Sequence, residues 1–230
     1  FEAGSDILDI GAESSRPGAI PTPESHELQR LLPVLKELAS WGVPVSVDTY
    51  KPAVMRAALE AGATMINDIT GMISPEALSV VAESNCAVCV MHMQGEPCTM
   101  QQAPQYQNVV AEVRSFLTDA VERCRQAGIA DQRIVVDPGF GFGKTLNHNL
   151  DLFSALTVAG VGELPILVGL SRKSMLGVIT GRPVGERLAG SVAAALLAAQ
   201  KGAKILRVHD VAATRDALAV WAAIEQREQE

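Results

Sequence analysis

Short apolar runs alternate with longer helix-like segments along the whole chain, and this alternation limits the possible folds more than any other feature. Runs of about four β-branched or apolar residues predict buried strands, and the segments between them place apolar residues at helical spacing. Several predicted helices end at a glycine just before the next strand, where a left-handed residue commonly ends a helix. These glycines are Gly4, Gly42, Gly62, Gly128 and Gly202. The pattern predicts an α/β protein with a parallel sheet.

The alternation predicts seven strands, at residues 7–10, 43–47, 65–66, 87–91, 134–136, 166–168 and 205–208. The first helix is predicted to begin with Thr22 as its N-cap and to end before Gly42, with Leu31 and Leu35 on its apolar face. The other predicted helices are 52–61, 75–84, 109–126, 150–156, 189–200 and 216–228.

Polar side chains gather at the points where these strands end. They include Asp9, Asp48, Asn67, Asp137 and Arg207. Chemistry at the C-terminal ends of alternating strands is typical of a (β/α)8 TIM barrel, and a doubly wound open sheet is the structural alternative. We therefore expect a single barrel domain over residues 1–230.

A barrel needs one strand more than the pattern supplies. The chain opens on a predicted helix end at Ala3 and Gly4. We therefore expect the first strand and most of the first helix to lie before Phe1. The gap should then lie between strands 7–10 and 205–208, because the first strand of a barrel separates the second from the eighth. The segment 1–230 alone is expected to be an incompetent enzyme.

The segment Ile134–Lys144 combines a buried strand with a glycine-rich loop. Pro138 must end the strand, and Phe140 and Phe142 alternate with glycines that allow close backbone approach. A Walker A loop would need glycine at Pro138, and a dinucleotide fingerprint would need glycine at Lys144. A carboxylate at Asp137 beside an aromatic loop instead predicts a small-molecule site.

Composition excludes several classes of protein. The net charge of −7 argues against general binding to nucleic acids or anionic membranes. No apolar run approaches the roughly 20 residues of a membrane span, and no signal peptide is visible. Cys86 and Cys89 have C-x-x-C spacing but lie in a predicted strand, where they are expected to be ordinary buried thiols. A reducing, cytoplasmic compartment is expected.

If the barrel is right, its mouth combines carboxylates, an amide, cations, an imidazole and a hydroxyl. Carboxylate and amide groups suit a ring with N–H donors and a carbonyl, such as a pterin, and cations suit an anionic leaving group or a carboxylate. Asp48 and Asn67 could instead cap the helices that follow them. The expected residues are Arg16, Asp48, Asn67, Asp137, Lys173, Arg207, His209 and either Ser171 or Ser174.

Seven segments, in the same order along nearly the whole chain, resemble the dihydropteroate synthase family of folate biosynthesis. The Asp-Pro-Gly-Phe-Gly-Phe-Gly-Lys and Ser-Arg-Lys-Ser segments are the specific ones. The segments are Gly11–Gly18, Ser46–Thr49, Ile66–Ile69, Val90–Met93, Asp137–Lys144, Gly169–Ser174 and Arg207–Asp210.

The resemblance implies condensation of 6-hydroxymethyl-7,8-dihydropterin diphosphate with 4-aminobenzoate to give 7,8-dihydropteroate and pyrophosphate. Asp48, Asn67, Asp137 and Lys173 are then expected to hold the pterin, and Arg207 and His209 the diphosphate. Ser15, Arg16, Phe142, Lys173 and Ser174 are expected to receive the aminobenzoate, with Met91 and Gly169 as further substrate-binding residues. The expected catalytic residues are Asp48, Lys173, Arg207 and His209.

The same resemblance implies Mg2+ as the cofactor and a homodimer formed through helices near the C-terminus. The family's Mg2+-binding asparagine lies in a first loop that is absent from this chain, so no metal ligand is predicted. Ser15 stands where the family usually has threonine, a change that keeps the hydroxyl group.

Two other functions remain open from the residues. A pterin-binding methyltransferase domain would share the aspartate and asparagine contacts but would not need the Ser-Arg-Lys-Ser segment or the Arg207–His209 pair. A non-catalytic pterin-binding module is the alternative from outside the enzymes.

Overall fold

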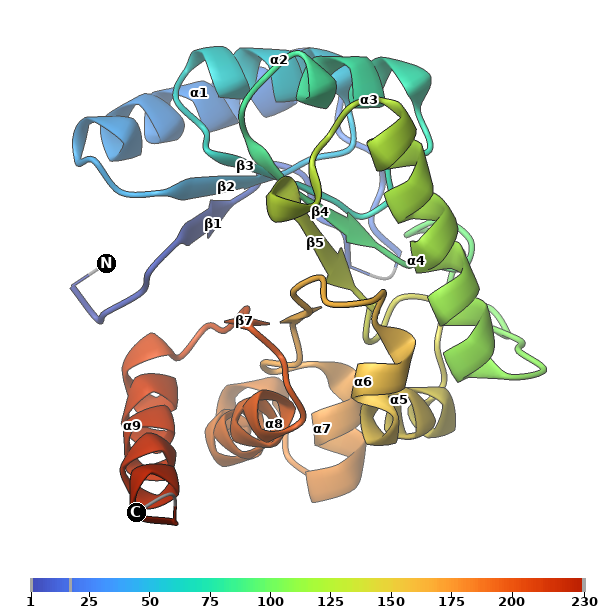
Figure 1. The fold of residues 1–230 in the computed structure, drawn as a ribbon, viewed down its shortest axis with the longest axis vertical. Coiled ribbons are helices and arrows are strands. Elements are labelled where there is room, and N and C mark those ends of the chain that lie inside the picture. Colours follow the sequence, from blue (N-terminus) through green and yellow to red (C-terminus); the bar gives the residue numbers. More distant parts are fainter. Residues whose placement is uncertain (1, 17, 229–230) are drawn as a thin grey trace.

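The computed structural model describes residues 2–16 and 18–228, and these contain seven strands and nine α-helices in near-strict alternation (Figure 1). The strands are β1 (Leu8–Ile10), β2 (Val45–Asp48), β3 (Met65–Asp68), β4 (Ala87–Met91), β5 (Ile134–Asp137), β6 (Leu167–Val168) and β7 (Ile205–Leu206). The helices are α1 (Glu24–Ser40), α2 (Pro52–Glu60), α3 (Pro75–Ala82), α4 (Val109–Gln126), α5 (Leu146–Ser154), α6 (Leu156–Ala159), α7 (Ser174–Thr180), α8 (Leu188–Gln200) and α9 (Val211–Glu228).

The strands pair in the order in which they occur along the chain. β1 to β5 form one parallel sheet and β6 pairs with β7. A parallel bridge between Val136 of β5 and Ile166, which precedes β6, joins the two groups. A doubly wound sheet would reverse its strand order at a switch point. The consecutive order therefore favours the barrel over the open sheet.

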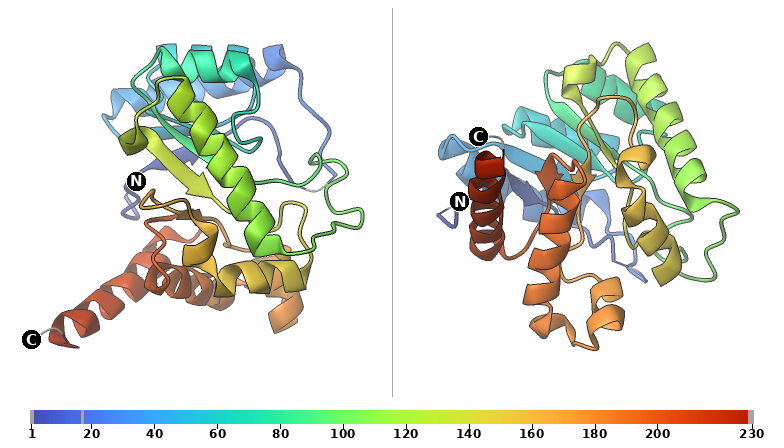
Figure 2. Two further views of the ribbon diagram at one scale, coloured as in Figure 1. Left: turned by 45° about the vertical axis from the view of Figure 1, so that its right-hand side comes forward. Right: turned by 60° about the horizontal axis from the view of Figure 1, so that its bottom comes forward.

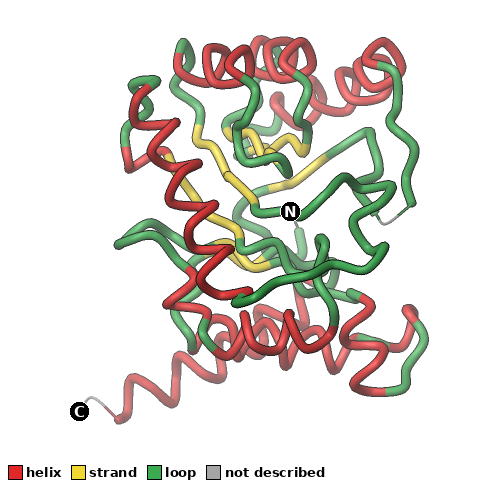
Figure 3. The backbone as a smooth tube through the Cα atoms, turned by 90° about the vertical axis from the view of Figure 1, so that its right-hand side faces the viewer, coloured by secondary structure: helices red, strands yellow, loops and turns green. Residues whose placement is uncertain are grey.

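β1 and β7 are the outer strands of this order, as predicted for the two sides of the gap. The guanidinium of Arg207, just after β7, nevertheless reaches Asp9 of β1 with an Nε–Oδ2 distance of 2.6 Å. The sheet must curve to bring its two outer strands near enough for this side-chain contact. Helices lie above, to the left of and below the strands in the tube view, whereas loops occupy the right-hand side (Figure 3). The first strand of the barrel, which is expected ahead of Phe1, is not among the described residues.

The strands bury side chains on both faces. Val88 and Val90 of β4 belong to the large core between the strands and the helices. Cys89, which points the other way, belongs to a smaller cluster with Met65, Val135 and Leu167. Residues that alternate along a strand face opposite sides, so this second cluster is the apolar filling on the inner face of the curved sheet.

The predicted helix ends at Gly42, Gly62, Gly128 and Gly202 are confirmed, because α1, α2, α4 and α8 end just before them, whereas no helix precedes Gly4 among the described residues. All five of those glycines have positive φ, from +70° at Gly42 to +104° at Gly62. This is the left-handed region, where a Cβ atom would be strained.

Three predicted helix starts were wrong. The closing helix, expected from residue 216, begins at Val211. Thr22 does not cap α1, because Pro23 occupies the N-cap position without a side-chain cap and the backbone of Thr22 bonds elsewhere. The helix expected from residue 150 begins at Leu146, where Thr145 and His148 form a capping box. That pair lacks the usual Glu or Gln, so the sequence pattern did not reveal it.

Among residues 2–16 and 18–228, no helix is both long enough and apolar enough to cross a membrane. The C-terminal helix α9 packs against α8 and extends away from the rest of the fold (Figure 2). Its exposed side chains include Val220 and Ile224.

Candidate active site

The candidate site is a polar layer that lies directly above the inner apolar cluster. Each strand of the cluster contributes an apolar residue and, two positions later on the same face, a residue of the layer. Met65 is followed by Asn67, and Val135 is followed by Asp137. Cys89, Leu167 and Ile205 are likewise followed, two positions on, by Met91, Gly169 and Arg207. Five predicted site residues therefore share one face because of strand periodicity.

Arg207 lies between two carboxylates. Its Nε atom is 2.6 Å from Oδ2 of Asp9, and its Nη2 atom is 3.4 Å from Oδ2 of Asp48. Burial and the neighbouring Asp9 carboxylate raise the pKa of Asp48 to about 7, although Arg207 opposes the shift. Asp9 was noted at a strand end but not predicted as a site residue. Only the curvature of the sheet brings it to Arg207.

Asn67 and Asp137 present hydrogen-bonding groups on a buried surface. The side chain of Asn67 is 5% exposed, and its Oδ1 atom has no partner among the described residues. Oδ1 of Asp137 accepts a hydrogen bond from the N–H of Gly139 at 2.7 Å. Burial raises the pKa of Asp137, and the charge of Lys173 opposes that shift. An unpartnered buried amide oxygen is costly unless a ligand satisfies it.

Asp48 and Asn67 do not cap the following helices. Lys51 occupies the N-cap position of α2, and Ser74 caps α3 with its side chain. The alternative role of these two residues as helix caps is therefore wrong.

Lys173 connects the glycine-rich loop to the polar layer. Its Nζ atom donates to the carbonyl oxygen of Phe140 and lies 4.8 Å from the ring centroid of Phe142. Burial lowers the pKa of Lys173 to about 8, and Asp137 opposes the shift. A Cβ atom on Gly169 would lie 4.0 Å from the same Nζ. Lys173, Phe142 and Asp137 are therefore brought together as predicted.

The remaining predicted residues lie at the rim. Nδ1 of His209 is 3.0 Å from Oγ of Ser171. Burial, together with Arg172 and Arg207, lowers the pKa of His209, and Arg16 is close enough to add to that shift. Arg16 and Ser174 are exposed, whereas Ser15 is half-buried in the loop that follows β1.

The sequence interpretation missed a buried pair that supports the glycine-rich loop. Lys144 donates to the carbonyl oxygens of Gly139 at 2.8 Å and Phe142 at 3.1 Å, and its Nζ lies 2.8 Å from Nδ1 of His92. Its position at the end of the Asp-Pro-Gly-Phe-Gly-Phe-Gly-Lys segment was the available signal. Burial lowers the pKa of Lys144 to about 7.

The carboxylates of the layer do not form a metal cluster. Among the described residues, no group of three or more His, Cys, Asp or Glu side chains could hold a metal ion. The carboxylates of Asp9 and Asp48 both contact the guanidinium of Arg207 instead. The residues that the structure describes therefore do not fit a Mg2+ ion held by protein ligands alone.

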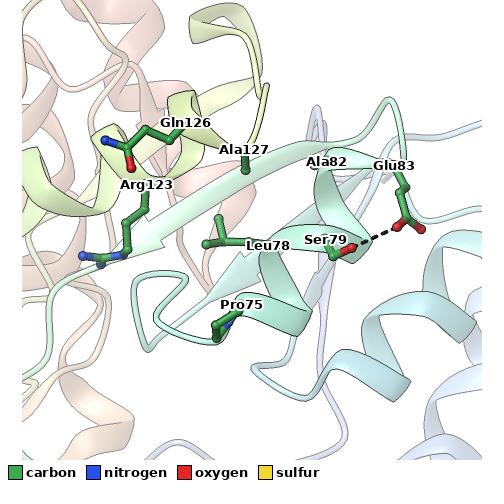
Figure 4. Close-up of a pocket in the computed structure, with 8 residues that line it drawn as sticks. All are labelled: Pro75, Leu78, Ser79, Ala82, Glu83, Arg123, Gln126 and Ala127. Carbon is green, nitrogen blue, oxygen red and sulfur yellow. Dashed lines mark hydrogen bonds between the residues drawn. The ribbon is translucent and has the colours of Figure 1, made fainter.

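A surface groove of about 580 Å3 lies elsewhere, between α3 and α4 (Figure 4). Its lining includes Gln126 and Ala127 at the C-terminal end of α4, which precedes the N-terminal end of β5. The groove thus reaches the edge opposite the polar layer. Apart from Glu83 and Arg123 its lining is uncharged, so it offers little chemistry.

Comparisons with known proteins agree with this geometry. A family model described as "Pterin binding enzyme" matches residues 1–209. Dihydropteroate synthase of Escherichia coli (strain K12) is 49% identical over 221 residues, which cover 96% of this chain and 78% of the relative. Dihydropteroate synthase of Haemophilus influenzae is 48% identical over 224 residues, which cover 97% of this chain and 82% of the relative.

Solved structures are similar over almost the entire chain. Burkholderia cenocepacia dihydropteroate synthase, complexed with 7,8-dihydropteroate, matches with a TM-score of 0.94 and 52% identity, covering 99% of this chain and 84% of that one. The Xanthomonas albilineans enzyme with 4-aminobenzoic acid matches with a TM-score of 0.92 and 50% identity, covering 97% and 81%. These likenesses confirm the barrel fold, and the chain belongs to the pterin-binding enzymes and, within them, to the dihydropteroate synthases.

Proposed function

We propose that the polar layer is the active site of this dihydropteroate synthase, which condenses 6-hydroxymethyl-7,8-dihydropterin diphosphate with 4-aminobenzoate. One observation carries the placement. Buried hydrogen-bonding groups and cations from separate strands converge directly above the inner apolar cluster, with Oδ1 of Asn67 unpartnered among the described residues. A pterin ring offers both donors and acceptors to such a surface.

The pterin would lie against Asn67, Asp137 and Asp48, with the side chain of Met91 beside it. Carboxylates accept from the amino and ring N–H groups of the pterin, and Lys173 donates to its acceptors. The buried position of Asp137, which is 6% exposed, supports its role deep in the site. The solved relative that holds 7,8-dihydropteroate supports a pterin product in this fold.

The diphosphate would lie toward Arg207 and His209. The bond between the pterin methylene and the diphosphate oxygen breaks, and its electron pair leaves with the diphosphate. The amine nitrogen of 4-aminobenzoate then attacks the cationic methylene and afterwards loses a proton. Arg207 stabilises the departing anion, whereas Asp48 and Asp137 stabilise the cation through preorganised charge.

The aminobenzoate would enter at the rim. Ser15, Arg16, Lys173 and Ser174 supply donors for its carboxylate, and Phe142 supplies an apolar face. Structures of relatives with 4-aminobenzoic acid and with a sulfonamide drug support a site for arylamines in this family.

We also propose that Mg2+ takes part, bound mainly by the substrate's diphosphate. When bound, it would neutralise the charge of the leaving group. The described residues do not supply a set of protein ligands for it, so every step above is derived from the chain's own side chains.

Three further properties are proposed. Residues 1–230 form one domain, supported by the continuous strand order. The protein works in the cytoplasm, supported by its four free cysteines.

The protein forms a homodimer through its C-terminal helices. Exposed apolar side chains on α7, α8 and α9 support this proposal, and light scattering can test it. These side chains are Val178, Ile179, Leu188, Leu197, Val220 and Ile224.

The decisive experiment measures pyrophosphate release with both substrates and Mg2+, and with each substrate omitted. Release only when both are present is expected. Methyl transfer from a methyl donor would instead indicate a pterin-binding methyltransferase. Pterin binding without either reaction would indicate a non-catalytic module. The 49% identity to a dihydropteroate synthase favours the first outcome.

A further inference from the structure

A network of charged residues outside the polar layer, in which Glu27 is buried and Glu13 and Lys51 are partly buried, anchors the loop between β1 and α1. The loop carries Ser15 and Arg16, and its described residues form no helix or strand. Its anchor is Glu13, whose Oε1 accepts from the hydroxyl of Tyr50 at 2.8 Å. Oε2 of Glu13 accepts from the N–H of Thr22 at 2.9 Å and from the ammonium of Lys51. One carboxylate thus ties the start of the loop to its end.

Lys51 joins this carboxylate to two other parts of the fold. Its Nζ atom donates to the carbonyl oxygen of Thr22 at 2.5 Å and to Oε2 of Glu27, in α1, at 2.7 Å. Glu27 is 1% exposed, and its Oε1 accepts from the hydroxyl of Thr49 at 2.8 Å. Thr49 directly follows Asp48, so the network runs from the loop to the strand that carries a proposed pterin contact.

The network keeps its charges despite burial. Burial by itself would raise the pKa of Glu13, but hydrogen bonds from Lys51, Tyr50 and Thr22 hold that pKa below its usual value. Burial would lower the pKa of Lys51, but Glu13 and Glu27 hold it above its usual value. Buried charges persist only when paired and hydrogen-bonded. Both carboxylates and the ammonium of this network are thus paired and hydrogen-bonded.

We infer that Glu13 and Lys51 are positioning residues that set the location of Ser15 and Arg16 over the barrel mouth, and thereby control capture of the arylamine substrate. Ser15 is two residues from Glu13, so a shift of this anchor moves its hydroxyl directly. The pterin contacts Asn67 and Asp137 lie on strands outside the network, and the carboxylate of Asp48 contacts Arg207 instead of a member of the network. This inference rests on the proposed function, in which Ser15 and Arg16 receive 4-aminobenzoate.

The test compares Michaelis constants for the two substrates in the whole protein. Glu13→Gln keeps the side-chain shape but turns an amide N–H or a weaker acceptor toward Lys51. It should raise the KM for 4-aminobenzoate roughly tenfold or more, as expected when a positioning group shifts by a fraction of an ångström. The KM for the pterin diphosphate should change less than about twofold. Tyr50→Phe should raise the KM for 4-aminobenzoate by a smaller factor. Lys51→Met should also raise this KM, and Lys51→Arg should raise it less than Lys51→Met does.

Glu24→Gln is the matched control, because Glu24 is an exposed acid in the first turn of the same helix that holds Glu27. It should leave both constants unchanged. A lower melting temperature for Glu13→Gln with an unchanged KM for 4-aminobenzoate would make the network merely structural and overturn the inference. Equal increases in both constants would also overturn it. If Glu13→Gln does not fold, Tyr50→Phe decides by the same criteria.

Arg16→Ala separates this inference from the proposed function. If Arg16→Ala raises the KM for 4-aminobenzoate while Glu13→Gln and Tyr50→Phe do not, the function stands and the positioning role is wrong. If Arg16→Ala has no effect in an active enzyme, the proposed arylamine site itself is wrong.

Discussion

The Nζ atom of Lys144 lies 2.8 Å from the Nδ1 atom of His92, and both side chains are buried. Below the Lys144 pKa of about 7, its ammonium can only donate, so Nδ1 of His92 accepts and the histidine proton lies on Nε2. Burial and the charge of Lys144 lower the pKa of His92 to about 3. The pair holds the loop of residues 138–143 against the end of β4, and its charge state has consequences for stability.

Acid should weaken the fold through His92. The unfolded state takes up a proton near the ordinary histidine pKa of 6.5, whereas the folded state resists protonation down to about 3. The stability contributed by neutral His92 is therefore complete above pH 6.5 and lost progressively toward pH 3, by up to about 1.4 kcal/mol per pH unit. The free energy of unfolding, measured with urea between pH 4.5 and 7.5, should change less with pH in His92→Asn than in the parent protein. The asparagine keeps an acceptor but does not titrate. Parallel curves for the two proteins would refute this role.

Gly139 should tolerate a side chain far less than Gly42. Both have nearly the same φ, +68° at Gly139 and +70° at Gly42. A Cβ atom on Gly42 would meet nothing within 4 Å, whereas one on Gly139 would overlap the carbonyl oxygen of His92. Gly42→Ala should therefore cost about 1 kcal/mol from backbone strain alone, and Gly139→Ala about 3 kcal/mol or more. Chemical denaturation of both variants measures the difference, and equal costs would mean that the close approach is unimportant.

Asp137→Asn should impair pterin binding more than folding. The amide oxygen can still accept from the N–H of Gly139, so the turn survives. The amide nitrogen instead presents donors where the pterin needs acceptors, and a lost charged hydrogen bond typically costs about 1.5–3 kcal/mol. Calorimetry should show that affinity for the pterin diphosphate falls roughly tenfold or more. A well-folded variant with unchanged affinity would remove Asp137 from the site.

Lys173→Ala should raise the Michaelis constants of both substrates. One ammonium contacts the Phe140 carbonyl and lies over the Phe142 ring while interacting electrostatically with Asp137. We expect a loss of roughly tenfold or more in kcat/KM for each substrate. Lys204→Ala, at an exposed lysine before β7, is the control and should behave as the parent. Intact constants for Lys173→Ala would show that the ammonium faces neither substrate.

Turnover should depend on the ionisation of Asp48. Its pKa is raised to about 7, so the carboxylate gains a proton as the pH falls through that value. If the charged form stabilises the cationic pterin, kcat/KM should fall about tenfold per pH unit below pH 7. Asp48→Asn should be slower and should lack this inflection. An inflection that persists in Asp48→Asn would assign the titration to another group.

Local periodicity in the sequence was enough to predict the strands, most helix ends and the location of the site at the C-terminal ends of the strands. Ala87–Met91 and Val109–Gln126 form their elements with the predicted bounds, because burial on regular spacing is a local property. The left-handed glycines and the turn forced by Pro138 are likewise written in single residues. Alternation along each strand also places Asn67, Asp137 and Arg207 on one face.

The contacts across the barrel were decided only by the tertiary structure. Asp9 reaches Arg207, 198 positions away, because the curved sheet brings the side chains of its two outer strands together across the gap. Lys144 finds His92, and Lys51 finds Glu13 and Glu27, because neighbouring strands bring their loops together. No spacing rule within a segment encodes such pairs, since each depends on strand order and on the depth at which two side chains are desolvated. For the same reason the pKa values of Asp48, His92 and Lys144 follow from the folded arrangement and not from residue type.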